Sequence, residues 1–280
     1  MTKINLQNND IFFENPKRIV YPTCWIEFIP VGFKIIEYSK PMCLVELGTH
    51  SGNSFCTFNQ AVEFLHLETK CYAIDNWEGD FQAGFYGPSI YDELFEYCRQ
   101  EYPQSAILIK KTFDEANLLF EDNSIDLLHL DGLHTYEAIK HDFFKWLPKL
   151  SHTGIILFHD ICVKSKGFGV HQFWNEIKAD YGFAEFCYGN GLGVLFVGSE
   201  IDQIQKDNLL FISRDGIWKN LLEMKGQHIF LKRENKLLEF ALSRSSKILD
   251  NYKESKSYKI GMILLSPLRY LMNKINKFRS

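Results

Sequence analysis

The sequence predicts an α/β fold, a doubly wound and mostly parallel sheet that finishes in an antiparallel hairpin. Short apolar runs alternate with longer helical patterns between residues 43 and 182. The runs are almost continuously apolar, as in strands that helices cover on both faces. Residues 183–198, "FAEFCYGNGLGVLFVG", then hold two apolar runs around Asn190-Gly191, a dipeptide favoured in hairpin turns. Because parallel connections are right-handed, these elements wind around one sheet.

Each element of this sheet follows from its local pattern. Apolar, β-rich runs predict five parallel strands, and the hairpin brings the sheet to seven; the five lie at 43–47, 71–74, 106–110, 125–130 and 154–158. Amphipathic patterns between them predict the connecting helices at 53–66, 89–101, 113–120, 135–147 and 169–181. The alternation of the two kinds of element is typical of a Rossmann-like domain.

The segments on either side of this domain are predicted to be helical. Residues 24–40 resemble a lead-in helix that covers the ligand-binding side. Beyond residue 200 the strand signals stop, and residues 232–252 form an amphipathic pattern with Leu238, Leu242, Leu249 and Tyr252 on one stripe. We therefore divide the chain into an N-terminal segment (1–40), the sheet domain (41–200) and a helical, basic C-terminal extension (201–280).

Composition excludes several classes of protein. The net charge is −4, but residues 251–280 carry seven Lys or Arg and one Glu, so the remainder sums to −10. An acidic body argues against nucleic acid as a partner. The seven cysteines form no CxxC pair, and no window has the ~20 apolar residues of a membrane span. We therefore expect a soluble protein of the reducing cytoplasm.

The basic C-terminal tail, 259–280, leaves two interpretations open. Ser266-Pro267 is a plausible helix start, and Leu268, Leu271 and Ile275 continue on one face with basic residues around them. This pattern suits peripheral contact with an anionic membrane, at the inner membrane face. It equally suits packing on the body or on a second subunit of a homo-oligomer.

Polar residues gather where the predicted strands end, which is where open parallel sheets bind ligands. In "VELGTHSGNS", Gly48 and Gly52 bracket a tight turn and Glu46 can face the crevice, but His50 breaks the dinucleotide fingerprint. A plain corner-turning loop is the alternative. Asp75 ends the second strand and suits a ribose, with an Asx turn or a helix N-cap as its alternative.

Two further strand ends carry titratable groups. Asp131 and His134 follow the fourth strand, and His159-Asp160 ends the fifth, so these groups can reach one ion. His129, inside the strand, is expected in the core, and His141 on a helix surface. A cation and an imidazole next to each other can activate a hydroxyl group, by polarising it and by accepting its proton.

Four stretches resemble one family: "VELGTHSGNSF", "AIDNWEGDFQAGFYG", "IDLLHLDGLHTYEAIKHDFFKWLPKLSHTGIILFHD" and "GLGVLFVG". Together, over roughly residues 20–200, they resemble class I methyltransferases of methyltransferase family 24, which are similar to macrolide-sugar O-methyltransferases. The resemblance implies S-adenosyl-L-methionine as cofactor. The residues expected to bind it are Glu46, Gly48, Thr49, Gly52, Ser54, Asp75, Asn76, Trp77, Thr112, Phe113 and Asp131.

The resemblance also implies a divalent metal, Mg²⁺ or Mn²⁺, held by Asp131, His159 and Asp160. His134 is then the general base, and Asp131 and His134 are the catalytic residues. His159 departs from the family pattern, which often has a carboxylate there, and imidazole suits softer metals than Mg²⁺. Trp77 and Phe113 are expected to flank an adenine, although core packing is the common role of such aromatics.

These patterns predict an S-adenosylmethionine-dependent O-methyltransferase that acts on a sugar hydroxyl, in glycan biosynthesis or on a glycosylated small molecule. Two alternatives stay open. One is a metal-dependent hydrolase on the same fold, and the other is a catalytically silent methyltransferase-like module in a glycan-assembly complex.

Overall fold

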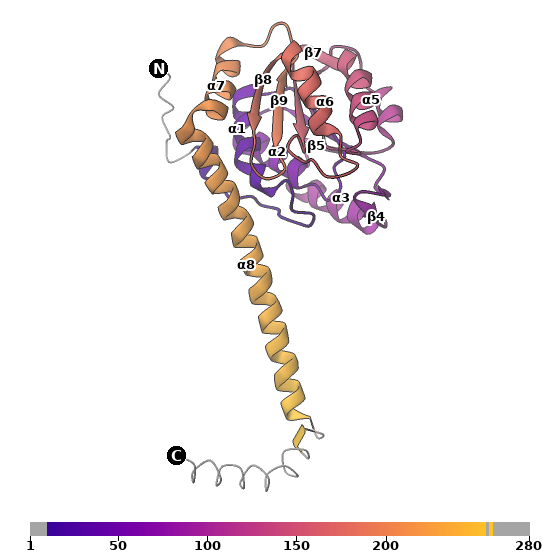
Figure 1. Cartoon of the computed structure of the whole chain (residues 1–280). Coiled ribbons are helices and arrows are strands. Elements are labelled where there is room, and N and C mark those ends of the chain that lie inside the picture. The colour runs from indigo at the N-terminus through magenta and orange to yellow at the C-terminus, as the bar shows by residue number, and fades with distance from the viewer. Residues whose placement is uncertain (1–9, 256–257, 260–280) are drawn as a thin grey trace. The chain divides into compact units, whose positions relative to one another are not determined.

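The computed structural model describes residues 10–255 and 258–259 (Figure 1). The chain divides into two compact units, residues 1–230 and residues 231–280. The first unit contains the whole sheet.

The sheet has seven strands in the order β5-β2-β1-β6-β7-β9-β8. The first five strands in that order pair in parallel, and β9 runs antiparallel to both β7 and β8. The predicted sheet and its terminal hairpin are therefore confirmed. Their bounds are β1 Cys43–Leu47, β2 Lys70–Asp75, β5 Ala106–Lys110, β6 Ile125–Leu130, β7 Leu150–His159, β8 Gly182–Phe186 and β9 Leu192–Phe196.

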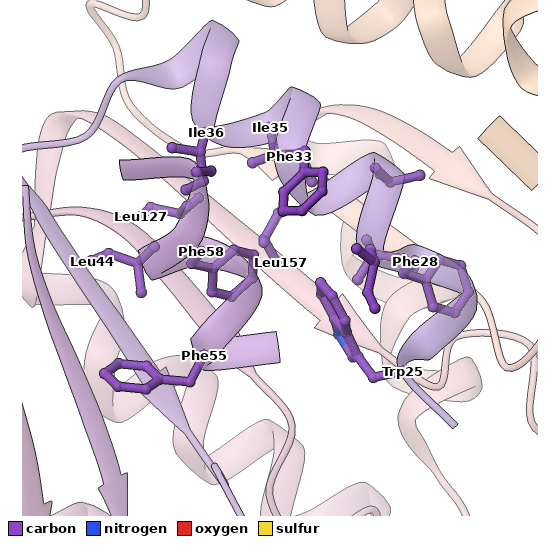
Figure 2. Packing of buried hydrophobic residues seen from close by; sticks show 14 of the residues in the cluster. Trp25, Phe28, Phe33, Ile35, Ile36, Leu44, Phe55, Phe58, Leu127 and Leu157 are labelled. Carbon is purple, nitrogen blue, oxygen red and sulfur yellow. The ribbon is translucent and has the colours of Figure 1, made fainter. Parts of the chain in front are cut away.

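Helices cover both faces of the sheet because successive strand residues are apolar on both faces. Leu44, Leu127 and Leu157 face one buried cluster, and their neighbours in the strands face another. The first cluster is completed by α1 Ile29–Ser39, α2 Asn53–Phe64, α3 Ser89–Glu101 and α7 Gln203–Arg214. The second is completed by α4 Phe113–Asn117, α5 Tyr136–Trp146 and α6 Val170–Ile177. Figure 2 shows the first cluster, in which rings from α1 and α2 lie beside the strand leucines.

Several helices differ from their predicted bounds. The lead-in segment is a 3₁₀ turn, Ile26–Phe28, followed by α1. Helix α4 ends at Asn117 instead of residue 120, and its first turn is held by a capping box between Thr112 and Glu115. The pattern over 169–181 divides into α6 and a 3₁₀ turn at Lys178–Asp180.

Other elements were not predicted at all. A two-stranded ribbon, β3 Gly79–Asp80 and β4 Gly84–Phe85, lies between β2 and α3. Residues 187–191 connect β8 to β9, so Asn190-Gly191 ends a longer connection instead of forming a two-residue turn. The C-terminal extension begins with α7, and the predicted helix 232–252 lies within a longer one, α8 Gly216–Glu254.

The start of α8 belongs to the first unit. Trp218, Leu222 and Ile229 are buried in the first cluster, and a Cβ on Gly226 would overlap the carbonyl oxygen of Glu27. Between Leu231 and Glu254 most side chains of the helix are exposed. Among the residues described, no helix is long and apolar enough to cross a membrane. The predicted tail helix, from Ser266 onward, lies outside the described residues.

Candidate functional site

A cavity of about 550 Å³ lies at the carboxyl ends of the parallel strands. Residues at or directly after five strand ends line it: Gly48, Thr49, Asp75, Asn76, Lys111, Thr112, Asp131, Gly132 and Asp160. Ser54, Phe113 and His134 complete the predicted site residues on its wall. Its size falls within the range of small-molecule sites, roughly 300–1,000 Å³.

Gly48 shapes the turn after β1. Its φ is +89°, a backbone conformation that L-residues rarely adopt, and a Cβ there would overlap the carbonyl oxygen of Asp131. The glycine therefore lets the β1 turn pass directly over the end of β6. Gly52 also has a positive φ, of +84°, but it packs against Leu94 and does not line the cavity.

Asp75 faces both the β1 turn and the cavity. Its Oδ2 accepts a hydrogen bond from the backbone N–H of His50 and its Oδ1 from that of Trp77, each at 2.8 Å. The second bond is an Asx turn, the alternative that the sequence also predicts for Asp75. Burial raises the pKa of Asp75, and these backbone donors oppose that shift. Remaining lone pairs on the two oxygens can still accept from a ligand in the cavity.

Two other predicted cofactor residues lie away from the cavity. Glu46 is fully buried, with its Oε2 2.8 Å from Nδ1 of His129, and His129 accepts a hydrogen bond from Trp25. His129 is therefore a core histidine, as expected. Trp77 is 1% exposed and donates from Nε1 to the carbonyl of His50 at 2.8 Å, so it stabilises the β1 turn from the protein interior. Neither Glu46 nor Trp77 lines the cavity, so neither is placed to contact a ligand there directly.

Three side chains form a cluster on the cavity wall: Asp131, His134 and Asp160 have ligand atoms within 4.8 Å of one another. Nε2 of His134 lies 2.9 Å from Oδ2 of Asp160 and 3.5 Å from Oδ1 of Asp131. Two carboxylates and an imidazole are a suitable donor set for a divalent cation such as Mn²⁺. Asp160 has φ +64°, a conformation that Asp tolerates better than most residues.

The cluster strongly perturbs its own titration. Burial disfavours the charged form of His134, but hydrogen bonds to Asp131 and Asp160 outweigh it and raise the pKa of His134 to about 10. Burial also opposes ionisation of Asp131, whereas the neighbouring histidines His159 and His134 hold its pKa well below the usual range. Opposite charges packed at a cavity wall are a common property of functional sites.

One member of the predicted metal set, His159, lies outside the three-residue cluster. His159 was expected to bind the ion with Asp131 and Asp160, but its ring lies behind them, buried against Phe28. Its Nδ1 is 3.0 Å from Oδ1 of Asp131, so it holds that carboxylate from the protein side. His134 takes its place in the cluster. The order of strand ends brings both histidines to this edge, but only the folded chain determines which one faces the cavity.

Sequence reasoning missed two polar residues that hold the cluster. Nδ2 of Asn190 donates to Oδ1 of Asp160 at 2.8 Å, and Oε1 of Gln82 accepts from the backbone N–H of His134 at 2.9 Å. The sequence pattern predicts only a turn at Asn190. Gln82 lies in the ribbon β3–β4, for which the sequence has no periodic signal. The ring of Phe168 also stacks on His134, with centroids 4.9 Å apart.

Two buried polar atoms in the β1 turn lack a hydrogen-bond partner in the part of the chain that the structure describes. Oγ1 of Thr49 and Nδ1 of His50 are buried and have no hydrogen-bond partner among the described residues. Buried polar groups normally have a partner, so two unpaired atoms in one turn are an unusual feature of this part of the site. Both residues line the cavity beside Asp75.

Comparison with known proteins finds similarity to a methyltransferase family. Residues 45–161 match the family described as "Methyltransferase domain", methyltransferase family 24. The match spans the strands and turns that build most of the cavity wall, including Asp131, His134 and Asp160. The strand order confirms the predicted doubly wound sheet with its antiparallel end, and the match over residues 45–161 agrees with the predicted methyltransferase domain.

Individual relatives are similar over part of the chain. The sequence is 45% identical over 179 residues, 64% of this chain, to the uncharacterized protein y4gI of Sinorhizobium fredii, and it spans 20% of that protein's length. An SAH-bound methyltransferase of Podospora anserina is 14% identical, covering 60% of this chain and 76% of its own, with a TM-score of 0.47. A methyltransferase of Geobacter sulfurreducens is 11% identical, covering 61% and 78%, with a TM-score of 0.47.

Proposed function

We propose that this protein is an S-adenosyl-L-methionine-dependent O-methyltransferase that acts on a sugar hydroxyl of a glycan or glycosylated metabolite. One observation carries the proposal: a methyltransferase domain has two carboxylates and an imidazole clustered at the wall of its strand-end cavity. The same cavity contains the glycine turn and the acidic strand end that suit the cofactor.

The cofactor would supply an electrophilic methyl group, and the turn after β1 would bind it. Gly48 and Thr49 would present their backbone to it, and Asp75 with Asn76 would accept the ribose hydroxyls. Thr112, Phe113 and Ser54 line the rest of this part of the cavity. Glu46, Gly52 and Trp77 would act on the cofactor only through the turn that they support.

Asp131 and Asp160 would hold a divalent cation, Mg²⁺ or Mn²⁺, which would polarise the acceptor hydroxyl. A cation held by the two carboxylates would oppose the rise in the pKa of His134 that they cause, so that Nε2, the ring nitrogen that faces them, would be free to accept the proton of that hydroxyl. His159 would fix the direction of Asp131. Methyl transfer needs the attacking oxygen in line with the leaving sulfur, so holding the acceptor in place is the main task of this wall.

Cellular context completes the proposal. A glycan acceptor suits an enzyme of glycan biosynthesis in the cytoplasm, with no nucleic acid as partner. We also propose that the protein forms a homo-oligomer. Residues 259–280 would make peripheral contact with an anionic membrane.

The test combines binding and turnover. The protein is incubated with labelled S-adenosylmethionine and a set of nucleotide sugars and glycans, with and without EDTA. We expect label in a sugar, loss of activity after chelation, and recovery with Mn²⁺ or Mg²⁺. His134→Ala should lower kcat by about 10²–10⁴-fold, because a positioned base contributes that much, and should leave S-adenosylhomocysteine affinity nearly unchanged.

Other outcomes would redirect the assignment. Binding of S-adenosylhomocysteine without turnover on any acceptor would favour a silent binding module. Metal-dependent hydrolysis without cofactor binding would favour the hydrolase. Full activity of His134→Ala would remove that residue as the base, and indifference to exhaustive chelation would remove the metal.

A further inference from the structure

Gln82 connects three segments around the candidate base. It lies between β3 and β4, and its Oε1 accepts from the backbone N–H of His134 at 2.9 Å. The same oxygen lies 3.2 Å from Nδ1 of the His134 ring. At its other end, Nε2 donates to the carbonyl of Gly167 at 3.1 Å.

These contacts determine which way the amide faces. An amide oxygen only accepts hydrogen bonds and an amide nitrogen only donates them. Reversing the group would place its N–H₂ against the N–H of His134 and its oxygen against the carbonyl of Gly167. Both contacts would then be repulsive, so the oxygen faces the histidine.

The orientation of Gln82 in turn determines the orientation of the imidazole. Since Oε1 can only accept, Nδ1 must be the donor, and the nitrogen left to face Asp131 and Asp160 is Nε2. Phe168 stacks on the ring at an interplanar angle of 15°, which restricts its rotation. Phe168 directly follows Gly167, so the same loop contacts both the amide and the ring.

We propose that Gln82 is a positioning residue for His134: it keeps a hydrogen on Nδ1 and so directs Nε2 at the acidic pair. The proposal rests on the proposed function for what Nε2 does: with a cation at the acidic pair, Nε2 can lose its hydrogen and act as a base or as a metal ligand. Gln82 also connects His134 to two neighbouring segments. The β3–β4 ribbon and the loop at Gly167 must both be in place for the imidazole to be held.

Two substitutions separate this role from simple packing. Gln82→Leu keeps the size of the side chain and removes the acceptor. Gln82→Glu keeps an acceptor for Nδ1–H but loses the donor to Gly167. Phe81→Leu, at the neighbouring and 70% exposed position, is the matched control. All proteins are full length and are loaded with Mg²⁺ and S-adenosylhomocysteine.

The readout is the His134 ring in ¹H–¹⁵N NMR spectra, together with kcat and KM. We expect Nδ1 to carry a hydrogen that exchanges slowly with water in the wild type, in Gln82→Glu and in Phe81→Leu. In Gln82→Leu this exchange should be at least tenfold faster. Its kcat should fall at least tenfold with the KM for S-adenosylmethionine unchanged, and Gln82→Glu should recover most of that loss.

A wild-type ring without hydrogen on Nδ1 would overturn the proposal, as would a Gln82→Leu spectrum identical to that of the wild type. The spectra need no acceptor and can be recorded with Mg²⁺ alone. The expected spectra in a protein that methylates nothing would therefore reject the proposed function and leave the role of Gln82 intact.

Discussion

One buried carboxylate outside the site, that of Asp142, has a strongly raised pKa. Asp142 lies in α5 and is 8% exposed, and no described residue donates a hydrogen bond to its carboxylate. Burial raises its pKa to about 7; the nearby His141 opposes this shift and Asp114 adds to it. The residue is thus neutral in the folded protein at mildly acidic pH and ionised in the unfolded chain.

This pKa predicts how Asp142→Asn changes stability. Because the folded-state pKa lies above the unfolded one, the stability contributed by the neutral form is complete below about pH 4. It is lost as pH rises to about 7. The variant should therefore unfold at nearly the wild-type temperature at pH 4, and at a higher temperature above pH 7. Thermal unfolding followed from pH 4 to 9 tests this, and a constant difference across the range would contradict it.

Gly48 determines the shape of the turn after β1, the proposed cofactor site. In Gly48→Ala the left-handed backbone costs roughly 1–2 kcal/mol, and the new methyl group meets the backbone of Asp131. The turn must move to relieve this contact, so we expect S-adenosylhomocysteine affinity to fall more than tenfold by calorimetry. Gly87→Ala is the control, since its Cβ would enter open space and its φ is ordinary. Equal affinity in both variants would show that the turn is not part of the cofactor site.

At the scale of elements, the amino ends of the strands hold the sheet together and the carboxyl ends hold the site. Asp126, near the start of β6, accepts hydrogen bonds from the backbone N–H groups of Met42 and Cys43 at 2.9 and 3.0 Å. It also accepts from the hydroxyls of Ser151 at 2.7 Å and Thr153 at 3.2 Å. One carboxylate thereby joins the first residues of β1, β6 and β7.

Asp126→Ala separates stability from function. Losing hydrogen bonds to a charged acceptor should lower the free energy of unfolding by roughly 1–3 kcal/mol. Asp126 is at the opposite end of β6 from Asp131, so S-adenosylhomocysteine affinity should be unchanged at a temperature where the variant is folded. Urea unfolding and calorimetry measure the two quantities. A loss of affinity without a loss of stability would contradict this division.

The elements that the sequence predicts are those with a local pattern of residues. The strands were predictable because strands buried on both faces are almost continuously apolar, as in Cys43–Leu47. The β3–β4 ribbon was not, because its strands have two residues each and depend on the positive φ of Gly79 and Gly84. Asp131 and Asp160 were predictable as strand ends, since parallel strands bring such ends to one edge.

The remaining site residues depend on contacts between distant parts of the chain. Gln82 meets His134 across 52 residues, and Asn190 meets Asp160 across 30 residues. Neither contact leaves a local pattern. The presence of His134 in the cluster, and not His159, also depends on distant contacts. His159 packs against Phe28 and His134 stacks on Phe168, and these contacts determine which ring faces the cavity.

For the molecule as a whole, the described cavity lies in the first of the two units, before residue 231. Every residue that lines the cavity belongs to the first unit, and so do the buried side chains of α8, of which Ile229 is the last. The described part of the second unit is helical, and Leu238, Phe240 and Leu242 are among its exposed apolar residues. Isolated helices with exposed apolar residues gain little stability from their own sequence.

Ending the chain at Phe230 should therefore leave the first unit intact. We expect the shortened protein to unfold within a few degrees of the full chain and to bind S-adenosylhomocysteine with the same affinity. Light scattering and flotation with anionic vesicles, run on both proteins at low salt, then show what residues 231–280 add. A smaller particle after shortening would assign them to self-association, and loss of flotation would assign them to the membrane. If shortening abolishes cofactor binding instead, the second unit is part of the site, and a cavity built by residues before 231 is not sufficient for function.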